Sequence, residues 1–372
     1  MQLLRSRAAL VALGGLLVLV VVIGAAVAVI NGGPDPTPTP PSPSPSPTAS
    51  PSPTPEPTPV AVCPMNGERV DQRAFATRVP LLVQIENNPI ARPPSGLNLA
   101  DLVIEAPVEG DTTRFAAVFM CDEEVAAAVG PVRSARYFNI DYWQQMRVVT
   151  LHFGGASKVL SRFNSVSMPF INGLTGGWGF FFRAGPWGAP HNVYLDVNAA
   201  RTEIEDGGSL DWASRAAGEV RAPFRFEEGR NLPDGGRAVD AIGLQTSSFW
   251  RFGWEWDEDT RHWFRTDGGA PNFDAVTGER ISARTVIVQI VRQEVLVGEN
   301  DPGGFPRRYQ FLVDSGDGVL YVNGEAHDVH WSRPTADDVT TWTYADSGDE
   351  VILPPGRVWW EIVPIGSAIF ES

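Results

Sequence analysis

The chain has 372 residues and carries 44 acidic against 29 basic side chains, which gives a formal net charge of −15 at pH 7. This acidic balance argues against nucleic-acid binding, and the length allows two folded domains. The two cysteines, Cys63 and Cys121, are too few for a metal cluster and form no CxxC motif. We therefore expect no metal ion and no cofactor.

The N-terminal segment predicts a membrane anchor. Residues 8–30 contain no charged side chain and are long enough to cross a bilayer as one helix. Arg5 and Arg7 precede this run and no basic residue follows before Arg69, so the N-terminus is expected in the cytoplasm and the rest outside. The apolar run is longer than the core of a usual signal peptide, which favours an uncleaved anchor in residues 1–33 over a cleaved signal.

A spacer rich in proline, serine and threonine follows in residues 34–60. This composition cannot bury a core and favours extended polyproline II, which at about 3.1 Å per residue reaches roughly 80 Å. The spacer would lift a folded ectodomain away from the membrane. Outside the cytoplasm a disulfide between Cys63 and Cys121 is the default expectation.

The pattern in residues 61–222 predicts an α/β domain. Short apolar, β-branched or aromatic runs predict strands at residues 79–86, 102–106, 114–120 and 148–153. Ser134 can cap an amphipathic helix that continues to Arg147, and helical patterns recur at residues 156–163 and 198–205. The order strand, helix, strand is typical of an α/β layer.

Residues 237–372 predict a second, mainly antiparallel β domain, after a polar segment with many glycines and prolines at residues 207–237. Strands are expected at residues 281–297, 308–313, 318–322 and 358–363. Turns are expected at residues 314–318 and at Asn323-Gly324.

The segment from Arg92 to Arg136 has the highest density of charged candidate residues. It contains Arg114, Arg133 and Arg136 together with Glu105 and Glu109. A helix starting at Ser134 would put Arg136 in its first turn, where a positive charge needs an anion opposite. Either Arg133 and Arg136 pair with Glu105, Glu109 or Asp101, or they form a pocket for a phosphate or carboxylate.

Two histidines are further candidates. His152 is expected at the carboxyl end of a central strand, before Gly154-Gly155, where open α/β sheets bind ligands. His191 precedes Asn192 in a loop rich in proline and glycine. If both histidines approach Arg133 and Arg136, Glu105 or Glu109 should orient one of the four. A core histidine bonded to the backbone is the alternative for His152.

Several motifs together resemble the YerB family of bacterial envelope proteins. They are RPPSGLNLADLVIEAPVEGDTTRFAAVF, GPVRSARYF, LHFGG, Pro190-His191-Asn192, and in the second half TVIVQIV and PGRVW. The resemblance covers residues 63–364 and implies an N-terminal and a C-terminal domain of unknown function. Members typically carry a lipid-modified cysteine behind the signal segment. This chain has none there, because Cys63 lies beyond the spacer.

Two hypotheses for function follow. The first is a non-enzymatic envelope module that binds or scaffolds peptidoglycan, another wall component or an envelope protein. The second is a hydrolase or transferase that acts on an anionic glycan or phosphorylated substrate. There His152 and His191 would be acid and base, while Arg133, Arg136, Ser134, Arg114 and Asn192 would hold the anion. No nucleophile motif of the GxSxG, HExxH or P-loop kind is present, which favours the first.

Overall fold

The computed structural model describes residues 60–71, 78–121, 128–205, 220–247 and 251–372. The predicted anchor in residues 1–33 and all of the predicted spacer except Val60 lie outside the described residues. Among the described residues, no helix has the length and apolar character needed to cross a bilayer.

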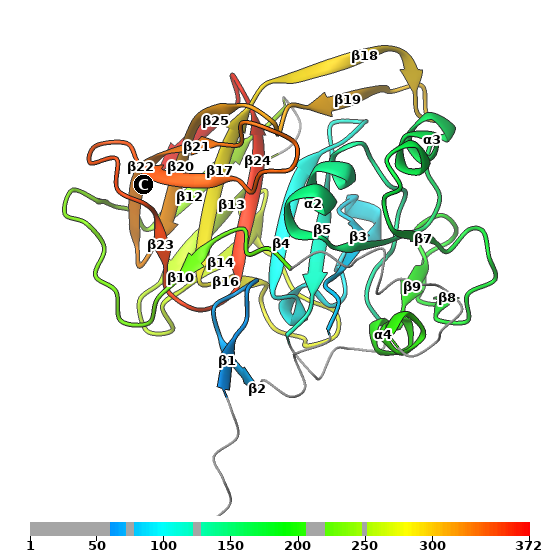
Figure 1. The fold of residues 1–372 in the computed structure, drawn as a ribbon, viewed down its shortest axis with the longest axis horizontal. Helices are drawn as coiled ribbons and strands as arrows, with labels where there is room; N and C mark the ends of the chain where they lie inside the picture. Colours follow the sequence, from blue (N-terminus) through cyan, green and yellow to red (C-terminus); the bar gives the residue numbers. More distant parts are fainter. Residues whose placement is uncertain (1–59, 72–77, 122–127, 206–219, 248–250) are drawn as a thin grey trace, which may run out of the picture. The chain divides into compact units, whose positions relative to one another are not determined.

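An eleven-stranded mixed sheet runs through both predicted domains (Figure 1). Its N-terminal half has the order β7 (Phe170–Asn172), β6 (Val149–His152), β3 (Leu81–Glu86), β5 (Thr113–Phe119) and β4 (Leu102–Pro107). Its C-terminal half continues with β24 (Val358–Pro364), β17 (Thr285–Val291), β20 (Ser315–Val322), β21 (Glu325–Ser332) and β11 (Arg237–Ala238), while β22 (Thr341–Tyr344) also pairs with β21.

The two halves of this sheet meet at a parallel strand pair. β24 lies beside β4, in a register that places Glu361 next to Glu105. β24 is also parallel to β17 on its other side. The α/β prediction for the N-terminal domain is therefore confirmed, whereas the C-terminal domain is only partly antiparallel and shares its sheet with the N-terminal one.

A second, six-stranded antiparallel sheet packs on the central one. Its order is β15 (Ala270–Pro271), β14 (His262–Asp267), β13 (Arg251–Asp257), β12 (Ala241–Gln245) and β25 (Ala368–Glu371), with β16 (Ser282–Ala283) beside β14. Trp254 and Trp263 are fully buried and make edge contacts with Trp359 and Tyr321 of the central sheet. Aromatic side chains thus fill the space between the sheets.

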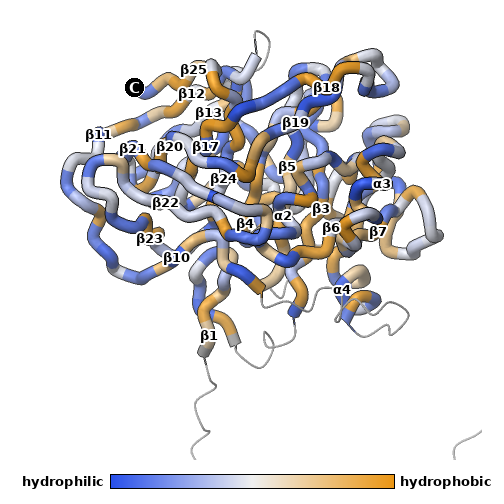
Figure 2. The backbone as a smooth tube through the Cα atoms, turned by 45° about the horizontal axis from the view of Figure 1, so that its top comes forward, coloured by the Kyte–Doolittle hydropathy of each residue, from blue (hydrophilic) through white to orange (hydrophobic). Residues whose placement is uncertain are grey.

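The helices cover the N-terminal half of the central sheet. α4 (Val197–Glu205) contributes Val197, Ala200 and Ile204 to the core on the same side as the second sheet. α2 (Phe138–Met146) contributes Phe138, Tyr142 and Met146 to the core on the opposite side. α3 (Ser157–Ser165) follows β6. Hydrophobic residues are concentrated along β3, β6 and β7 (Figure 2), as expected for strands that are buried on both faces.

Four two-stranded ribbons lie outside the two larger sheets. They are β1 (Val60–Val62) with β2 (Arg69–Asp71), β8 (Phe181–Arg183) with β9 (Val193–Leu195), β10 (Arg225–Phe226) with β23 (Ile352–Leu353), and β18 (Gln293–Asn300) with β19 (Pro306–Gln310). The β18–β19 hairpin extends from the C-terminal half towards α3 (Figure 1). There Glu299 accepts from Lys158 of α3 at 3.1 Å. This hairpin therefore connects the two halves at a second place.

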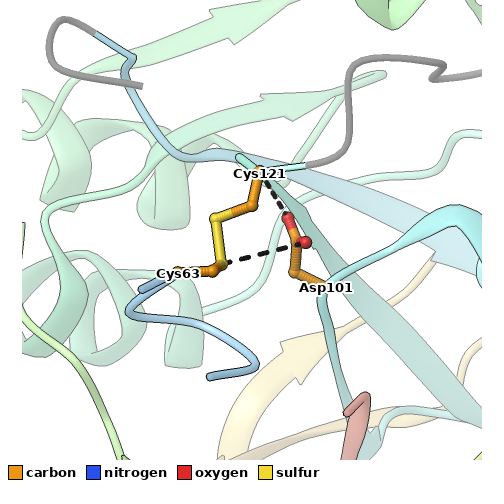
Figure 3. Close-up of side chains that lie close together, drawn as sticks. All are labelled: Cys63, Asp101 and Cys121. Atoms are coloured by element: carbon orange, nitrogen blue, oxygen red, sulfur yellow. Dashed lines mark hydrogen bonds between the residues drawn. A yellow bond between two sulfur atoms is a disulfide. The ribbon is translucent and has the colours of Figure 1, made fainter. Parts of the chain in front are cut away.

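The predicted disulfide between Cys63 and Cys121 is present, and it ties β1 and the loop after it to the end of β5 (Figure 3). The buried carboxylate of Asp101 lies beside it and accepts from the amides of Met120 at 2.6 Å and Cys121 at 2.9 Å.

Some predicted boundaries are wrong. α2 begins at Phe138, and Ser134 caps no helix. The side chain of Asn139 accepts from the amide of Arg136 at 2.8 Å, so the first turn is closed from within the helix and Arg136 precedes it. The long strand expected at residues 281–297 is three strands, β16, β17 and β18. The turn expected at residues 314–318 falls largely within β20, whereas Asn323-Gly324 is a hairpin turn with φ of 53° and 76°.

Candidate anion-binding site

The backbone around Arg133 crosses the carboxyl ends of β3 and β6. The amide of Arg133 donates to the carbonyl of Gln84 at 2.8 Å, and its carbonyl accepts from the amide of Phe153 at 3.0 Å. Both backbone groups of Arg133 are therefore held between two neighbouring strands. This arrangement directs a loop with several arginines to the edge of the sheet where α/β folds usually bind ligands.

Glu86, the last residue of β3, joins Arg133 to His191. Its carboxylate lies 3.4 Å from Nε of Arg133 and 3.0 Å from Nδ1 of His191. The Arg133 guanidinium also donates from Nη1 to the carbonyl of Pro190 at 2.9 Å. The predicted approach of Arg133 and His191 is thus present, and Glu86 is the carboxylate that orients both.

Glu109, in the loop between β4 and β5, pairs with two arginines. Arg136 donates to it from Nε at 2.8 Å and also from Nη2, and Arg307 of β19 donates from Nη1 at 2.8 Å. Burial opposes the ionisation of Glu109, but Arg136 outweighs it and holds the pKa of this carboxyl below its usual value. Glu109 is therefore an ionised carboxylate shared by both halves of the molecule.

Arg114 has no such partner. It is buried at the start of β5, and its Nη1 donates to the carbonyl of Ser134, which also accepts from Arg136 at 3.1 Å. Among the described residues, no carboxylate is ion-paired with Arg114. Burial and the neighbouring charges of Arg136 and Arg133 lower its pKa well below the ordinary arginine value, and the carboxylates of Glu109 and Glu86 offset this shift only in part.

We call Arg114, Arg133, Arg136 and Arg307 the arginine cluster. Three of its guanidinium groups pair with two carboxylates, Glu86 and Glu109, and Arg114 is ion-paired with none among the described residues, so the four arginines exceed these carboxylates by two charges. The excess stands out in a chain whose net charge is −15. Because buried like charges repel one another strongly, an anion placed among them would stabilise the arrangement.

Comparisons with known proteins identify the family. The description "Protein of unknown function (DUF3048) N-terminal domain" applies to residues 65–209, and the matching C-terminal domain description applies to residues 242–360. The chain belongs to the DUF3048 family. This confirms the resemblance that the sequence motifs indicate.

A relative of this DUF3048 chain is the "Putative lipoprotein YerB" of Bacillus subtilis (strain 168). It is 26% identical over 302 residues, which cover 81% of this chain and 86% of the relative. The crystal structure of YerB from Bacillus subtilis matches with a TM-score of 0.69 at 24% identity, covering 83% of this chain and 99% of the other. At this identity the match shows a shared fold.

The DUF3048 fold places His152 in a packed core. It is the last residue of β6, as predicted, but it is fully buried, and its ring contacts Phe163 and Phe170. Nδ1 lies 2.7 Å from the carbonyl of Gly154 and so donates to it. Burial lowers the pKa of His152 to about 4, which keeps the ring neutral at pH 7. A proton-exchanging residue needs access to substrate or solvent, which this ring lacks.

Two other predicted site residues have partners outside the arginine cluster. Glu105 orients neither histidine. It is fully buried and pairs with Arg265 of β14 at 2.8 Å. Asn192 accepts from Arg183 of β8 at 2.6 Å. The role of Asn192 as an anion ligand stays a prediction, as do the acid and base roles of His152 and His191.

Sequence reasoning missed Glu86 and Arg307. Glu86 is the only charged residue in the apolar run of residues 79–86 and stands at its carboxyl end, a position that could have marked it as a candidate. No local sequence pattern marks Arg307 as a site residue, because its partner Glu109 lies 198 positions away in the sequence.

Proposed function

We propose that this DUF3048 chain is a membrane-anchored, non-enzymatic envelope protein that binds an anionic group of a wall component or envelope partner at the arginine cluster. The single observation that carries this proposal is the buried guanidinium of Arg114, which has no carboxylate partner among the described residues. Buried charges are normally paired, so a missing counter-charge points to a ligand that supplies it.

The chemistry of the cluster suits a phosphate or a carboxylate. Arginine forks make bidentate, charge-assisted bonds to both groups. The side chains of Arg133 and His191 are 19% and 21% exposed, so the cluster can be reached from solvent on the side of the loop that carries His191. A ligand that bonds there would add negative charge next to Arg114 and Arg136.

The location outside the cytoplasm rests on two observations. The relative in Bacillus subtilis carries the name "Putative lipoprotein YerB", which supports a membrane-associated envelope protein. In this chain the apolar run of residues 8–30 is followed by a spacer without cysteine, which favours an uncleaved helix over a lipid as the anchor. Peptidoglycan or another envelope protein would then be within reach of the ectodomain.

Binding is favoured over catalysis by the environment of the histidines. Hydrolysis by an acid and a base needs two groups that can exchange protons with the substrate. His152 is fully buried between two phenylalanine rings and bonded to a backbone carbonyl. No observation favours the hydrolase or transferase alternative.

Titration calorimetry of the full-length chain in detergent tests the proposal. Glycerol 3-phosphate should bind in a saturable manner, while glycerol, the same molecule without the phosphate, should not. Arg133→Gln should weaken binding at least tenfold, because it removes the most accessible guanidinium of the cluster. Arg225→Gln is the matched control, since Arg225 pairs with Glu350 at the surface and should not affect binding. Equal heats for both ligands would contradict the proposal.

A further inference from the structure

The outer face of the six-stranded sheet carries a hollow of about 550 Å³. This hollow is separate from the arginine cluster, whose residues do not line it. We call it the glycine trough. In β12 and β13 the side chains of Ile242, Leu244, Phe252 and Trp254 are buried in the core. On the opposite face Gly243 and Gly253 lie directly across from each other. The floor of the trough is therefore bare backbone.

Strand pairing explains the glycine at position 253. A Cβ atom there would lie 2.1 Å from the carbonyl oxygen of Ile242, which no side chain can accommodate. Gly243 has no such restriction, since its Cβ would lie 3.5 Å from the nearest atom, Cβ of Phe370. Close strand packing thus requires only one of the two glycines, and the second keeps the trough open.

The walls of the trough are an aromatic ring and a set of polar groups. Phe370 of β25 lies beside Gly243 and is 54% exposed. Thr266 of β14 lies beside Gly253 on the other side. Gln245 and Arg251 stand at one end and bond to each other at 3.1 Å. The trough therefore offers one apolar wall and several hydrogen-bonding groups.

The side-chain carboxylates of the lining, Glu255 and Glu371, are ion-paired. Glu255 pairs with Arg280 at 2.7 Å, and Glu371 pairs with Arg237 at 3.2 Å and accepts from Tyr321 at 2.9 Å. Both side-chain carboxylates of the lining thus have an arginine partner, and the other two charged groups, Arg251 and the carboxylate of the last residue, Ser372, are opposite in sign. A ligand complementary to this surface is flat, uncharged and rich in hydroxyl groups.

We infer that the glycine trough binds an uncharged oligosaccharide. The C–H face of a sugar ring would pack on Phe370 and lie against the glycine floor, while its hydroxyl groups bond to Gln245, Arg251 and Thr266. An extended peptide fits less well, because the backbone groups of β12 and β13 in the floor are already bonded to each other. The inference is independent of the arginine cluster and its anion.

Calorimetry of the full-length chain in a zwitterionic, sugar-free detergent tests this inference. The probes are the uncharged tetrasaccharides of β-1,4-linked N-acetylglucosamine, α-1,4-linked glucose and β-1,3-linked glucose. At least one of them should bind in a saturable manner. Phe370→Ala should weaken that binding about tenfold, because it removes the stacking wall. Gly243→Val should abolish it by filling the floor.

Phe305→Ala is the matched control. Phe305 is 53% exposed, nearly the same as Phe370, but precedes β19 and does not line the trough. Its substitution should leave saccharide binding unchanged, and circular dichroism should show all three variants folded. Absence of binding to every probe would overturn the inference, as would binding unaffected by Phe370→Ala and Gly243→Val. Light scattering that shows two copies associating through the trough would overturn it too.

Discussion

Glu105 of β4 and Arg265 of β14 form a fully buried ion pair that joins the central sheet to the six-stranded sheet. Arg265 bonds both carboxylate oxygens, from Nη2 at 2.8 and 2.9 Å and from Nε at 3.2 Å. Burial opposes the charge of Arg265, but the carboxylates of Glu105 and Asp267 outweigh it and raise its pKa. The charge of Arg265 therefore depends on Glu105.

Glu105→Gln should destabilise the protein by about 3–5 kcal/mol, because it removes the carboxylate and leaves Arg265 in the core with Asp267 only at 3.6 Å. Urea unfolding followed by tryptophan fluorescence measures the loss. A loss below about 1 kcal/mol would contradict the account, since it would mean that water or another group compensates the buried guanidinium.

Glu361→Gln is the matched substitution and should have the opposite effect. Glu361 lies beside Glu105 in the register and bonds to Nε1 of Trp254 at 3.1 Å. Burial and the neighbouring Glu105 carboxylate raise its pKa well above the usual value. Its protonated form is thus the one that fits the fold, and glutamine mimics that form.

The pH dependence of this effect has a defined sign. Because the folded pKa of Glu361 is raised, its favourable contribution is fully present below the unfolded pKa, about 4.3, and is lost as pH rises through the folded value. Wild type and Glu361→Gln should therefore have similar unfolding free energies near pH 4, and the variant should gain an advantage as pH rises. An advantage that shrinks with rising pH would rule out this protonation state.

The disulfide should stabilise the fold by about 4 kcal/mol, because it closes a loop of 58 residues in the unfolded chain. The double variant Cys63→Ser, Cys121→Ser should lose this amount in urea unfolding. A reducing agent is the control, since it should destabilise the wild type and leave the double variant unchanged. Two free thiols in peptides mapped without reduction would refute the pairing.

The core strands were predictable from the sequence because they are buried on both faces. β3, β4, β5 and β6 appear as short apolar runs, and their ends lie within two residues of the predictions. The parallel pairing of β4 with β24 was not predictable. It joins positions more than 250 residues apart, as the bond from Trp359 to Glu105 illustrates, and no local pattern encodes such a pair.

The candidate site was predictable to a similar extent. Arg114, Arg133, Arg136 and Glu109 lie in one segment, so their density in the sequence predicted that they act together. Arg136 pairs internally with Glu109, as one of its two alternatives expects, and its role as an anion ligand stays a prediction. Arg265, which pairs with Glu105, lies 160 positions away in the sequence. This separation explains why the local sequence pattern groups Glu105 with the nearby arginines instead of with Arg265.

The orientation in the membrane has its own test. Arg5 and Arg7 should hold the N-terminus in the cytoplasm and leave all residues after Asn31 outside. Protease added to intact protoplasts should remove the ectodomain, and a cytoplasmic protein should remain uncut as the control. Protection of the ectodomain until the membrane is dissolved would reverse the assignment.

Substitution of different members of the arginine cluster should have different effects on the stability of the protein. Arg136→Gln should destabilise the protein, because Glu109 then loses one of its two partners in a buried position. Arg114→Gln should cost little or even stabilise the empty protein, since it strands no carboxylate and relieves repulsion from Arg133 and Arg136.

The most direct test is the unfolding free energy of wild type and Arg114→Gln, measured as phosphate replaces chloride at constant ionic strength. An anion that binds only the folded state raises the free energy of unfolding by RT ln(1 + [L]/Kd), where [L] is the anion concentration. We predict that phosphate stabilises the wild type progressively and does not stabilise Arg114→Gln, whose stability without phosphate equals or exceeds that of the wild type. A variant that is destabilised by about 3 kcal/mol without phosphate, or equal stabilisation of both proteins, would contradict the account.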